Sequence, residues 1–372
     1  MLQIVSKSDV PRCERCGISL VPQIVRNSES KKCVLCDSEQ KPKLMLFGKK
    51  NENEKINEII KQVKKNGIDR QFDCLVYTNG SRESIFLLQK LIEIHDLRCL
   101  VVFQHHPFLP KETRRYLYSL FAKWNLPFIR IKIESDFQKR LARKMILKYK
   151  KTGEKRFLEL GCLPCKMIHT ELYKIANATG IKTIFFAQLD DRKCFPGLIP
   201  QSNAKAFSIA EVLNQTPIKS DTFSFFLKLF FLKSRAKLFF DMPDSGPLRL
   251  LNPKIELINY FTVYSWDESE CRRTLSELDF SIPDDFVSPI LAHCLYAETI
   301  NKAWLEESGL SANELNISHM ARKGFLSHEK AVELIRKEGY ISNKKLTELY
   351  KRIKLIKRRH SPRALRVLKA NV

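Results

Sequence analysis

Short apolar runs alternate with amphipathic stretches from residue 53 to residue 187, and this alternation restricts the fold more than any other feature of the chain. The apolar runs are typical of buried strands, at 72–77, 99–103, 128–133 and 183–187. The stretches around them have apolar residues at helical spacing and predict helices over 53–65, 84–95, 111–124, 136–148 and 167–177. Strands that alternate with helices in this way form a doubly wound parallel sheet. We therefore expect an α/β domain whose ligands lie at the carboxyl ends of its strands.

Four cysteines near the N-terminus form two Cys-x-x-Cys pairs, Cys13 with Cys16 and Cys33 with Cys36. Each pair places two sulfurs on one side of a metal ion. The sixteen residues between the pairs allow the chain to fold back and complete a tetrahedral Zn²⁺ site. We therefore predict a zinc ribbon at residues 1–45 whose core is too small to fold alone. Such ribbons are more often structural or docking elements than catalytic ones.

The rest of the chain divides into three parts. Residues 46–204 form the expected α/β domain, residues 205–340 are expected to be mainly helical, and residues 341–372 form a basic tail. In the helical part, acids at 264–270 mark a helix start, and Ser327 is the expected N-cap of a helix that runs to Lys337. The tail carries eleven Lys and Arg against one acid, and it is either a solvated segment or a binding segment.

The net charge of +24 indicates a polyanionic partner, such as a nucleic acid, a phosphorylated substrate or an anionic membrane face. The eleven cysteines without a secretion signal indicate a reducing compartment, so we expect a cytoplasmic protein. The most apolar stretch, at 223–233, is too short to span a bilayer. It suits a mostly buried helix better than an interfacial membrane helix.

The loop at 77–84, Tyr-Thr-Asn-Gly-Ser-Arg-Glu-Ser, joins the first expected strand to a helix. The small residues Gly80 and Ser81 let backbone N–H groups turn toward an anion. The hydroxyl of Ser84 adds a donor, and the helix N-terminus adds its dipole. These features suit a phosphate site, although many strand–helix turns of this composition bind nothing.

The order of these elements resembles the PP-loop ATP pyrophosphatase superfamily. More narrowly, the chain is similar to the N-acetyl sugar amidotransferase branch of lipopolysaccharide biosynthesis. That branch has paired cysteine knuckles, an Asp-Cys strand such as 73–76 and a C-terminal Arg-x-Gly-x-x-Ser/Thr-x-Glu-x-Ala element, here 322–331. The segments 264–270 and 288–294 lie where it carries a Trp-containing helix start and an Asp-Cys pair. The resemblance covers residues 10–340.

The loop departs from the superfamily signature, Ser-Gly-Gly-x-Asp-Ser. When Ser84 is aligned with the final serine, only Gly80 and Ser84 match the signature. Asn79 replaces the first serine, Ser81 the second glycine and Glu83 the aspartate, and Arg82 stands at the variable position. Glu83 keeps the negative charge, Ser81 adds a Cβ where the backbone should approach pyrophosphate, and Arg82 can pair with phosphate instead. The resemblance implies ATP binding by Asn79, Gly80, Ser81, Arg82 and Ser84, with Glu83 and Ser84 as the catalytic residues. The altered loop leaves a catalytically degenerate scaffold as an alternative.

The resemblance also implies a reaction. With ATP and Mg²⁺, an oxygen of the substrate attacks the α-phosphorus and becomes adenylated while pyrophosphate leaves; a nitrogen or sulfur nucleophile then displaces AMP. For the sugar branch, the implied partners are a separate glutaminase subunit that supplies ammonia and a sugar or nucleotide-sugar acceptor. The acetamido group of that acceptor becomes an acetamidino group.

A second pair of cysteines gives a competing hypothesis. Cys162 and Cys165 open the helix at 167–177, and Cys194 follows the next strand. These three cysteines resemble those of tRNA-thiolating PP-loop enzymes, in which three thiolates hold an iron–sulfur cluster. A tRNA sulfurtransferase, with tRNA as its partner, is therefore the second functional hypothesis. The alternative that Cys162 and Cys165 are simply buried at the start of a helix and bind no metal is equally consistent with the sequence.

The remaining cysteines and histidines have weaker patterns. His105 and His106 end the second strand, where the superfamily contacts adenine or substrate, although a plain polar loop is the simpler reading. The other residues of interest are expected in the core (Cys74, Cys99 and Cys271) or at surface and packing positions (His169, His293 and His328).

Overall fold

A computed structural model describes residues 10–25, 31–38, 49–132, 134–154, 156–161, 165, 168–187, 252–264, 267–280, 294–322, 324, 326–338 and 343–356. Among these residues, no helix has the length and apolar character needed to cross a membrane. Cys162, Cys194 and the apolar stretch at 223–233 lie outside the described residues.

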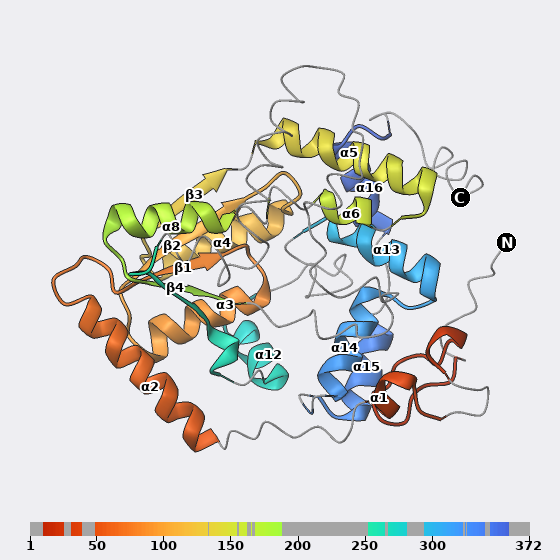
Figure 1. The fold of residues 1–372 in the computed structure, drawn as a ribbon, viewed down its shortest axis with the longest axis horizontal. Coiled ribbons are helices and arrows are strands. Elements are labelled where there is room, and N and C mark those ends of the chain that lie inside the picture. The colour runs from red at the N-terminus through yellow and green to blue at the C-terminus, as the bar shows by residue number, and fades with distance from the viewer. Residues whose placement is uncertain are drawn as a thin grey trace.

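Five parallel strands form one sheet in the order β3-β2-β1-β4-β5 (Figure 1). Their bounds are β1 Cys74–Thr78, β2 Cys99–His105, β3 Phe128–Lys132, β4 Thr183–Phe186 and β5 Glu256–Asn259. The chain adds β2 and β3 on one side of β1 and then crosses to add β4 and β5 on the other side. The strand order therefore changes direction between β1 and β4. Sheets of this kind bind ligands outside the carboxyl ends of the strands at this point.

Helices cover both faces of the sheet because its inner strands are apolar on both sides. Val101 and Phe103 of β2 pack in a cluster with α2, α3 and α4. Leu100 and Val102 point the other way and pack with α8. The bounds of these helices are α2 Lys49–Asn66, α3 Arg82–Gln89, α4 Lys111–Lys123 and α8 Ile168–Thr179. The core of the α/β unit thus has two apolar layers around one sheet.

The C-terminal region is helical and packs beside the sheet (Figure 1). Its helices are α12 Glu268–Glu277, α13 Ala297–Ser308, α14 Ala312–Arg322, α15 His328–Glu338 and α16 Asn343–Arg352. Apolar side chains of α13 and α16 pack against α5 (Ser135–Thr152) and α6 (Arg156–Leu160). Helix α16 lies within the predicted basic tail, and Lys345 and Leu349 are buried there, so the described part of the tail is packed.

The N-terminal cysteine module is small and lies against the C-terminal helices (Figure 1). It contains the short helices η1 (Pro22–Ile24) and α1 (Val34–Ser38). Its few apolar side chains, including Ile18 and Leu35, share one cluster with Leu310 and Leu315. The module therefore shares a core with α14 and the segment just before it, as a module this small requires.

The sequence-based expectations are confirmed for every strand and helix placed between residues 53 and 187, apart from shifts at their ends. Two features differ from the expectations. The helix after β1 continues as a π-helical turn over Lys90–Ile94. The other is β5, which lies in the part expected to be mainly helical. Only four residues long, β5 is too short to show a period, and its extended backbone depends on pairing with β4.

Candidate functional sites

Four cysteines from the two ends of the N-terminal module converge on one point. The sulfurs of Cys13, Cys16, Cys33 and Cys36 all lie within 4.8 Å of one another, and all four side chains are buried. The Sγ–Sγ distances are 3.6 Å for Cys13 and Cys36 and 3.7 Å for Cys16 and Cys33. Four sulfurs bound to one Zn²⁺ at about 2.3 Å lie roughly 3.8 Å apart. The structure therefore confirms a four-cysteine metal-binding site.

The electrostatics of the four thiols fit a bound cation. Hydrogen bonding to the Cys13 sulfur raises the pKa of both Cys16 and Cys36, and burial raises each further, whereas hydrogen bonding with Cys16 lowers the pKa of Cys13. Four buried thiolates this close repel one another strongly, and a divalent metal ion removes that penalty. The donor set, four sulfurs in a closed and buried shell, is typical of a structural zinc site with no open position for a substrate.

Arg322, the last residue of α14, approaches the cysteine site from the C-terminal region. Its Nη1 atom donates to Cys16 Sγ at 3.7 Å and to Ser318 Oγ at 3.2 Å, and the side chain is only 2% exposed. A buried guanidinium needs a nearby negative charge, and a metal bound by four thiolates carries one. Arg322 thus orients and balances the site from outside its ligand set.

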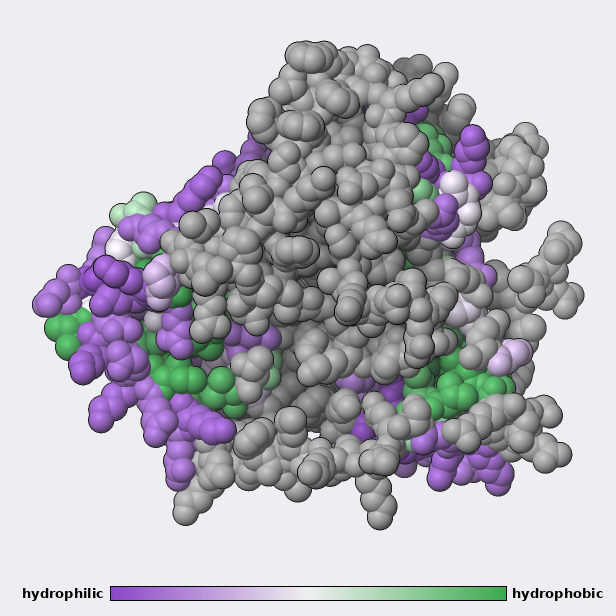
Figure 2. Space-filling model, in the orientation of Figure 1, coloured by the Kyte–Doolittle hydropathy of each residue, from purple (hydrophilic) through white to green (hydrophobic). Residues whose placement is uncertain are grey.

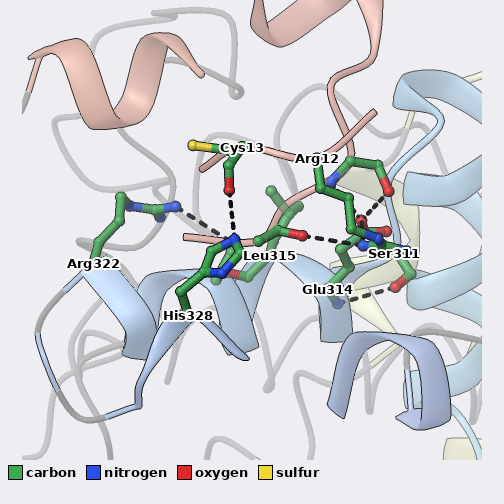
Figure 3. Close-up of polar contacts among 10 residues, drawn as sticks. Arg12, Cys13, Ser311, Glu314, Leu315, Arg322 and His328 are labelled. Carbon is green, nitrogen blue, oxygen red and sulfur yellow. Dashed lines mark hydrogen bonds and ion pairs between the residues drawn. The ribbon is translucent and has the colours of Figure 1, made fainter. Parts of the chain in front are cut away.

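Two further residues, His328 and Glu314, hold the module on α15 and α14 (Figure 3). The imidazole Nε2 of His328 lies 3.2 Å from the carbonyl oxygen of Cys13. The carboxylate of Glu314, fully buried on α14, accepts from the backbone N–H of Ser19 at 2.9 Å and lies 3.7 Å from Arg12 Nη1. His328 is thus a docking residue, in keeping with its expected packing role. Glu314 was missed in the sequence because its partners lie about three hundred positions away.

The loop after β1 lies where the strand order changes direction. Thr78 ends β1, and Ser81 caps α3, with its side chain accepting from the backbone N–H of Ser84 at 3.3 Å. The loop therefore places a helix N-terminus at the carboxyl edge of the sheet, beside β4. This position is the one at which a doubly wound sheet offers backbone donors to an anion.

Side-chain oxygens of the loop already accept bonds from several of its backbone donors. The N–H of Gly80 donates to Thr78 Oγ1 at 3.2 Å, and that of Ser81 donates to Asn79 Oδ1 at 2.9 Å. The hydroxyl of Ser84 lies 2.8 Å from that of Thr78 and donates to the carbonyl of Ser81 at 2.8 Å. Ser84 is 2% exposed. An anion on this loop would have to exchange these internal bonds for bonds to its own oxygens.

The charged pair of the loop is also engaged. Arg82 Nε lies 2.8 Å from Glu83 Oε1, and the Arg82 side chain is almost fully buried.

Gly80 has a φ of +85°, and a Cβ there would lie 2.9 Å from Leu117 Cδ1 on α4. The backbone conformation and the close approach of α4 both require glycine at this position.

Cys165, the second cysteine of the other pair, lies beside the carboxyl edge of the sheet. Its sulfur accepts from Gln138 Nε2 at 3.0 Å, and its carbonyl accepts from Gln104 Nε2 at 2.8 Å. Gln104 accepts in turn from the hydroxyl of Tyr77 on β1 at 2.5 Å. Burial, together with the nearby Cys294, raises the pKa of Cys165 to about 12. Tyr77 and Gln104 thus connect this thiol to the ends of β1 and β2.

Among the described residues, Cys294, which lies just before α13, is the cysteine whose charge affects the pKa of Cys165. Burial raises its pKa to about 11, while its backbone hydrogen bonds and the positive charges of Lys345 and Arg352 act in the opposite direction. Lys345 is itself buried and lies 3.3 Å from Glu298 Oε1. Sequence spacing did not distinguish Cys294 because about 130 residues separate it from Cys165. The predicted ligands Cys162 and Cys194 lie outside the described residues.

The other predicted positions are partly described. His105 ends β2 as expected, with Arg114 Nη1 3.4 Å from its Nε2 atom, and His106 is buried beside Phe108. The core cysteines Cys74, Cys99 and Cys271 are buried, which confirms their predicted place.

Comparisons with known proteins give a limited result. No family model matches the chain, and no curated protein matches it. Among solved structures, the NMN synthetase from Francisella tularensis is 12% identical, with 73% of this chain and 95% of that chain covered and a TM-score of 0.27. The U34-tRNA thiolase NcsA from Methanococcus maripaludis with its 4Fe-4S cluster is 12% identical, with 94% and 99% covered and a TM-score of 0.33. Because both TM-scores are low, the fold is defined here by the chain's own sheet topology and metal-binding cysteines.

Proposed function

We propose that this protein is an ATP-dependent enzyme of the PP-loop type that adenylates its substrate and releases pyrophosphate. The observation that carries the proposal is the place of the loop Asn79–Ser84. It begins at the carboxyl end of β1 and leads into the N-terminus of α3, where the parallel sheet changes direction. A nucleotide phosphate bound there is stabilised by backbone N–H groups and by the helix dipole.

ATP binding on this loop is an exchange of hydrogen bonds. The N–H groups of Gly80 and Ser81 leave the oxygens of Thr78 and Asn79 and donate to phosphate oxygens instead. Charge-assisted bonds to phosphate are roughly twice as strong as bonds between neutral groups, which offsets the loss of the internal bonds. Arg82 would pair with the phosphate in place of Glu83, and the Glu83 carboxylate would then hold Mg²⁺. These steps position the α-phosphorus for attack by a substrate oxygen.

For the acceptor, the resemblance favours an N-acetyl sugar whose amide oxygen is adenylated and then displaced by ammonia. Ammonia would come from a partner glutaminase, since free ammonia is scarce at neutral pH. The Arg322–Ala331 element supports this branch, and Arg322 lies at the metal centre. In this proposal the four-cysteine site binds Zn²⁺ and is structural.

Thiolation of tRNA is the second candidate, and a specific observation favours it. Cys165 is held at the carboxyl edge through Gln104 and Gln138, and Cys294 is near enough to affect its pKa. Thiols at this place suit a metal or cluster next to an adenylated base. Iron and a brown colour in protein purified without oxygen would favour this candidate over the sugar amidotransferase.

The test is an ATP–pyrophosphate exchange assay with sugar and tRNA acceptors. Glu83→Gln and Ser84→Ala should each reduce exchange by about 100-fold or more, because both remove groups at the reacting phosphates. Ser119→Ala is the matched control, since its hydroxyl is exposed and donates only to the carbonyl of Tyr116 within α4. Wild-type protein that neither binds nor turns over ATP at millimolar concentration would leave the degenerate scaffold as the correct reading.

A further inference from the structure

A cluster of positive side chains surrounds His105 at the carboxyl ends of β2 and β3. Arg130 pairs in register with Phe103, and Lys132 pairs with His105, so all four side chains lie on the same face of the sheet. Helix α4 covers that face, and it brings Arg114 Nη1 to 3.4 Å from His105 Nε2. Arg114 thus lies beside the imidazole, and Arg130 and Lys132 share its face of the sheet. Figure 2 shows mainly hydrophilic residues over the edge of the molecule where Figure 1 labels β3.

The cluster is costly for the folded protein in the absence of an anion. Burial lowers the pKa of His105, and Arg114, Arg130 and Lys132 lower it further. Among the described residues, no carboxylate offsets these cations in the pKa of His105, whereas the buried Lys345 and the part-buried Lys90 each have a glutamate partner. Converging cations in excess over nearby acids are typical of sites that recognise a phosphate or another anion.

The positive charge continues beyond the cluster. From residue 111 to residue 151, which includes α4, β3 and α5, there are thirteen Lys and Arg against three acids. None of these thirteen basic side chains is buried. Helix α5 begins three residues after β3 and has 18 residues, so it extends the charge by about 27 Å. A single phosphate or diphosphate is too small to neutralise a surface of this length.

We propose that Arg114, Arg130 and Lys132, together with the basic side chains of α5, form a binding surface for the phosphate backbone of an RNA strand. Phe128 on the same edge strand is 41% exposed and lies next to Tyr118, so an aromatic platform for an unstacked base adjoins the cations. This binding does not require ATP chemistry and would occur with either candidate reaction.

An anionic membrane fits the surface less well. A helix that lies in a membrane interface presents an apolar face to the lipid. The apolar residues of α5, such as Leu141 and Met145, are buried in the protein, and on its outer side only Leu147 is a large exposed apolar residue. The surface therefore offers charge with little apolar area, as phosphate backbones require.

The experiment measures binding of a fluorescein-labelled 20-nucleotide mixed-sequence single-stranded RNA to the full-length protein, without ATP, over a range of salt concentrations. The triple variant Arg114→Gln/Arg130→Gln/Lys132→Gln should bind about 10- to 100-fold more weakly at 0.1 M salt. The slope of log affinity against log salt should fall by about 2, because each phosphate contact on a single strand contributes about 0.7.

The matched control is Lys61→Gln/Lys64→Gln/Lys65→Gln on α2, which removes the same net charge from exposed positions far from β3 (Figure 1). Equal weakening by both triple variants would overturn the proposal, since it would show a general charge effect. Absence of RNA binding by the wild type would overturn it too. The surface would then be tested with vesicles containing 30% phosphatidylglycerol and with millimolar UDP. Binding of either that the β3 triple variant weakens would assign the surface to a membrane or to a small phosphate ligand instead. Thermal unfolding of each variant checks that the fold is retained.

Discussion

At the scale of single residues, Arg322 links the metal centre to the C-terminal helices. It donates to the sulfur of Cys16, and it is buried on α14. Partners of this kind, one step outside the metal ligands, fix the orientation of a ligand and its affinity for the ion.

Replacing Arg322 by Gln should lower zinc affinity by about 10- to 100-fold, because the thiolates lose a buried positive charge. Competition with a chromophoric chelator measures this change. Arg336→Gln on the exposed side of α15 removes an equal charge and should leave the affinity unchanged. Equal affinity for Arg322→Gln and wild type would mean that Arg322 only packs.

Gly80 is the residue on which the loop conformation depends. Gly80→Ala should lower the free energy of unfolding by about 1–3 kcal/mol from backbone strain, and by more once Leu117 and Thr113 are displaced. Gly153 also has a positive φ but has open space around it, so Gly153→Ala isolates the backbone cost. Chemical denaturation of both variants gives the difference, and a smaller loss at Gly80 than at Gly153 would contradict the expected crowding.

His105 should titrate below the ordinary histidine range. Its pKa is lowered by burial first, then by Arg114, Arg130 and Lys132. The neutral ring is favoured in the folded state. This contribution to stability is therefore present above the unfolded pKa near 6.5 and is lost as the pH falls toward the lower folded value. Arg114→Gln should raise the pKa of His105, measured by NMR titration of its ring protons. Arg115→Gln should leave that pKa unchanged, because Arg115 does not contribute to the shift.

At the scale of elements, the cysteine module depends on its metal ion for its fold. Its own apolar core is thin, and its four buried thiols need a cation. Chelation should lower the melting temperature and increase hydrogen exchange in residues 10–38 and in α14 and α15. The strands β1 to β4 should keep their protection because these hydrogen bonds join the module to α14 and α15 rather than to the sheet. Loss of protection in the sheet first would contradict a local role.

Particular elements show what the sequence could and could not predict. The strands β1, β2 and β4 were predictable because each is a continuous apolar run flanked by polar turns. The metal-binding cysteines were predictable because their spacing alone encodes the chemistry. By contrast, β5 and the partners Glu314 and Cys294 depend on contacts between distant positions. No local pattern records such contacts, so only the folded chain reveals them.

At the scale of the whole molecule, the N-terminal module and the C-terminal helices form one unit. Ser19 and Glu314 are 295 positions apart in sequence and share a buried hydrogen bond. Gly17 approaches Val332 so closely that a Cβ at position 17 would lie 2.8 Å from the valine methyl. A variant that lacks residues 1–45 leaves Glu314 without Ser19 and Arg12, a loss of about 3–5 kcal/mol when a buried charge loses its partners.

That deletion should keep the sheet while α14 and α15 lose protection in hydrogen exchange. Circular dichroism and exchange mass spectrometry, compared with full-length protein, measure both effects. Adding Glu314→Gln to the deletion should restore part of the protection, because it removes a buried charge that has lost Ser19 and Arg12. Unchanged protection of α14 in the deletion variant would show that the C-terminal helices fold without the module.

The packing of the N-terminal module on α14 and α15 has a consequence for how the protein is made. The cysteines of the module leave the ribosome first, but the arginine and glutamate that complete their surroundings are added about 300 residues later. At 5–20 residues per second, this delay is roughly 15–60 s. During that time the thiols lack the buried surroundings that α14 supplies, so we expect them to be more open to oxidants and to competing metal ions than in the folded protein.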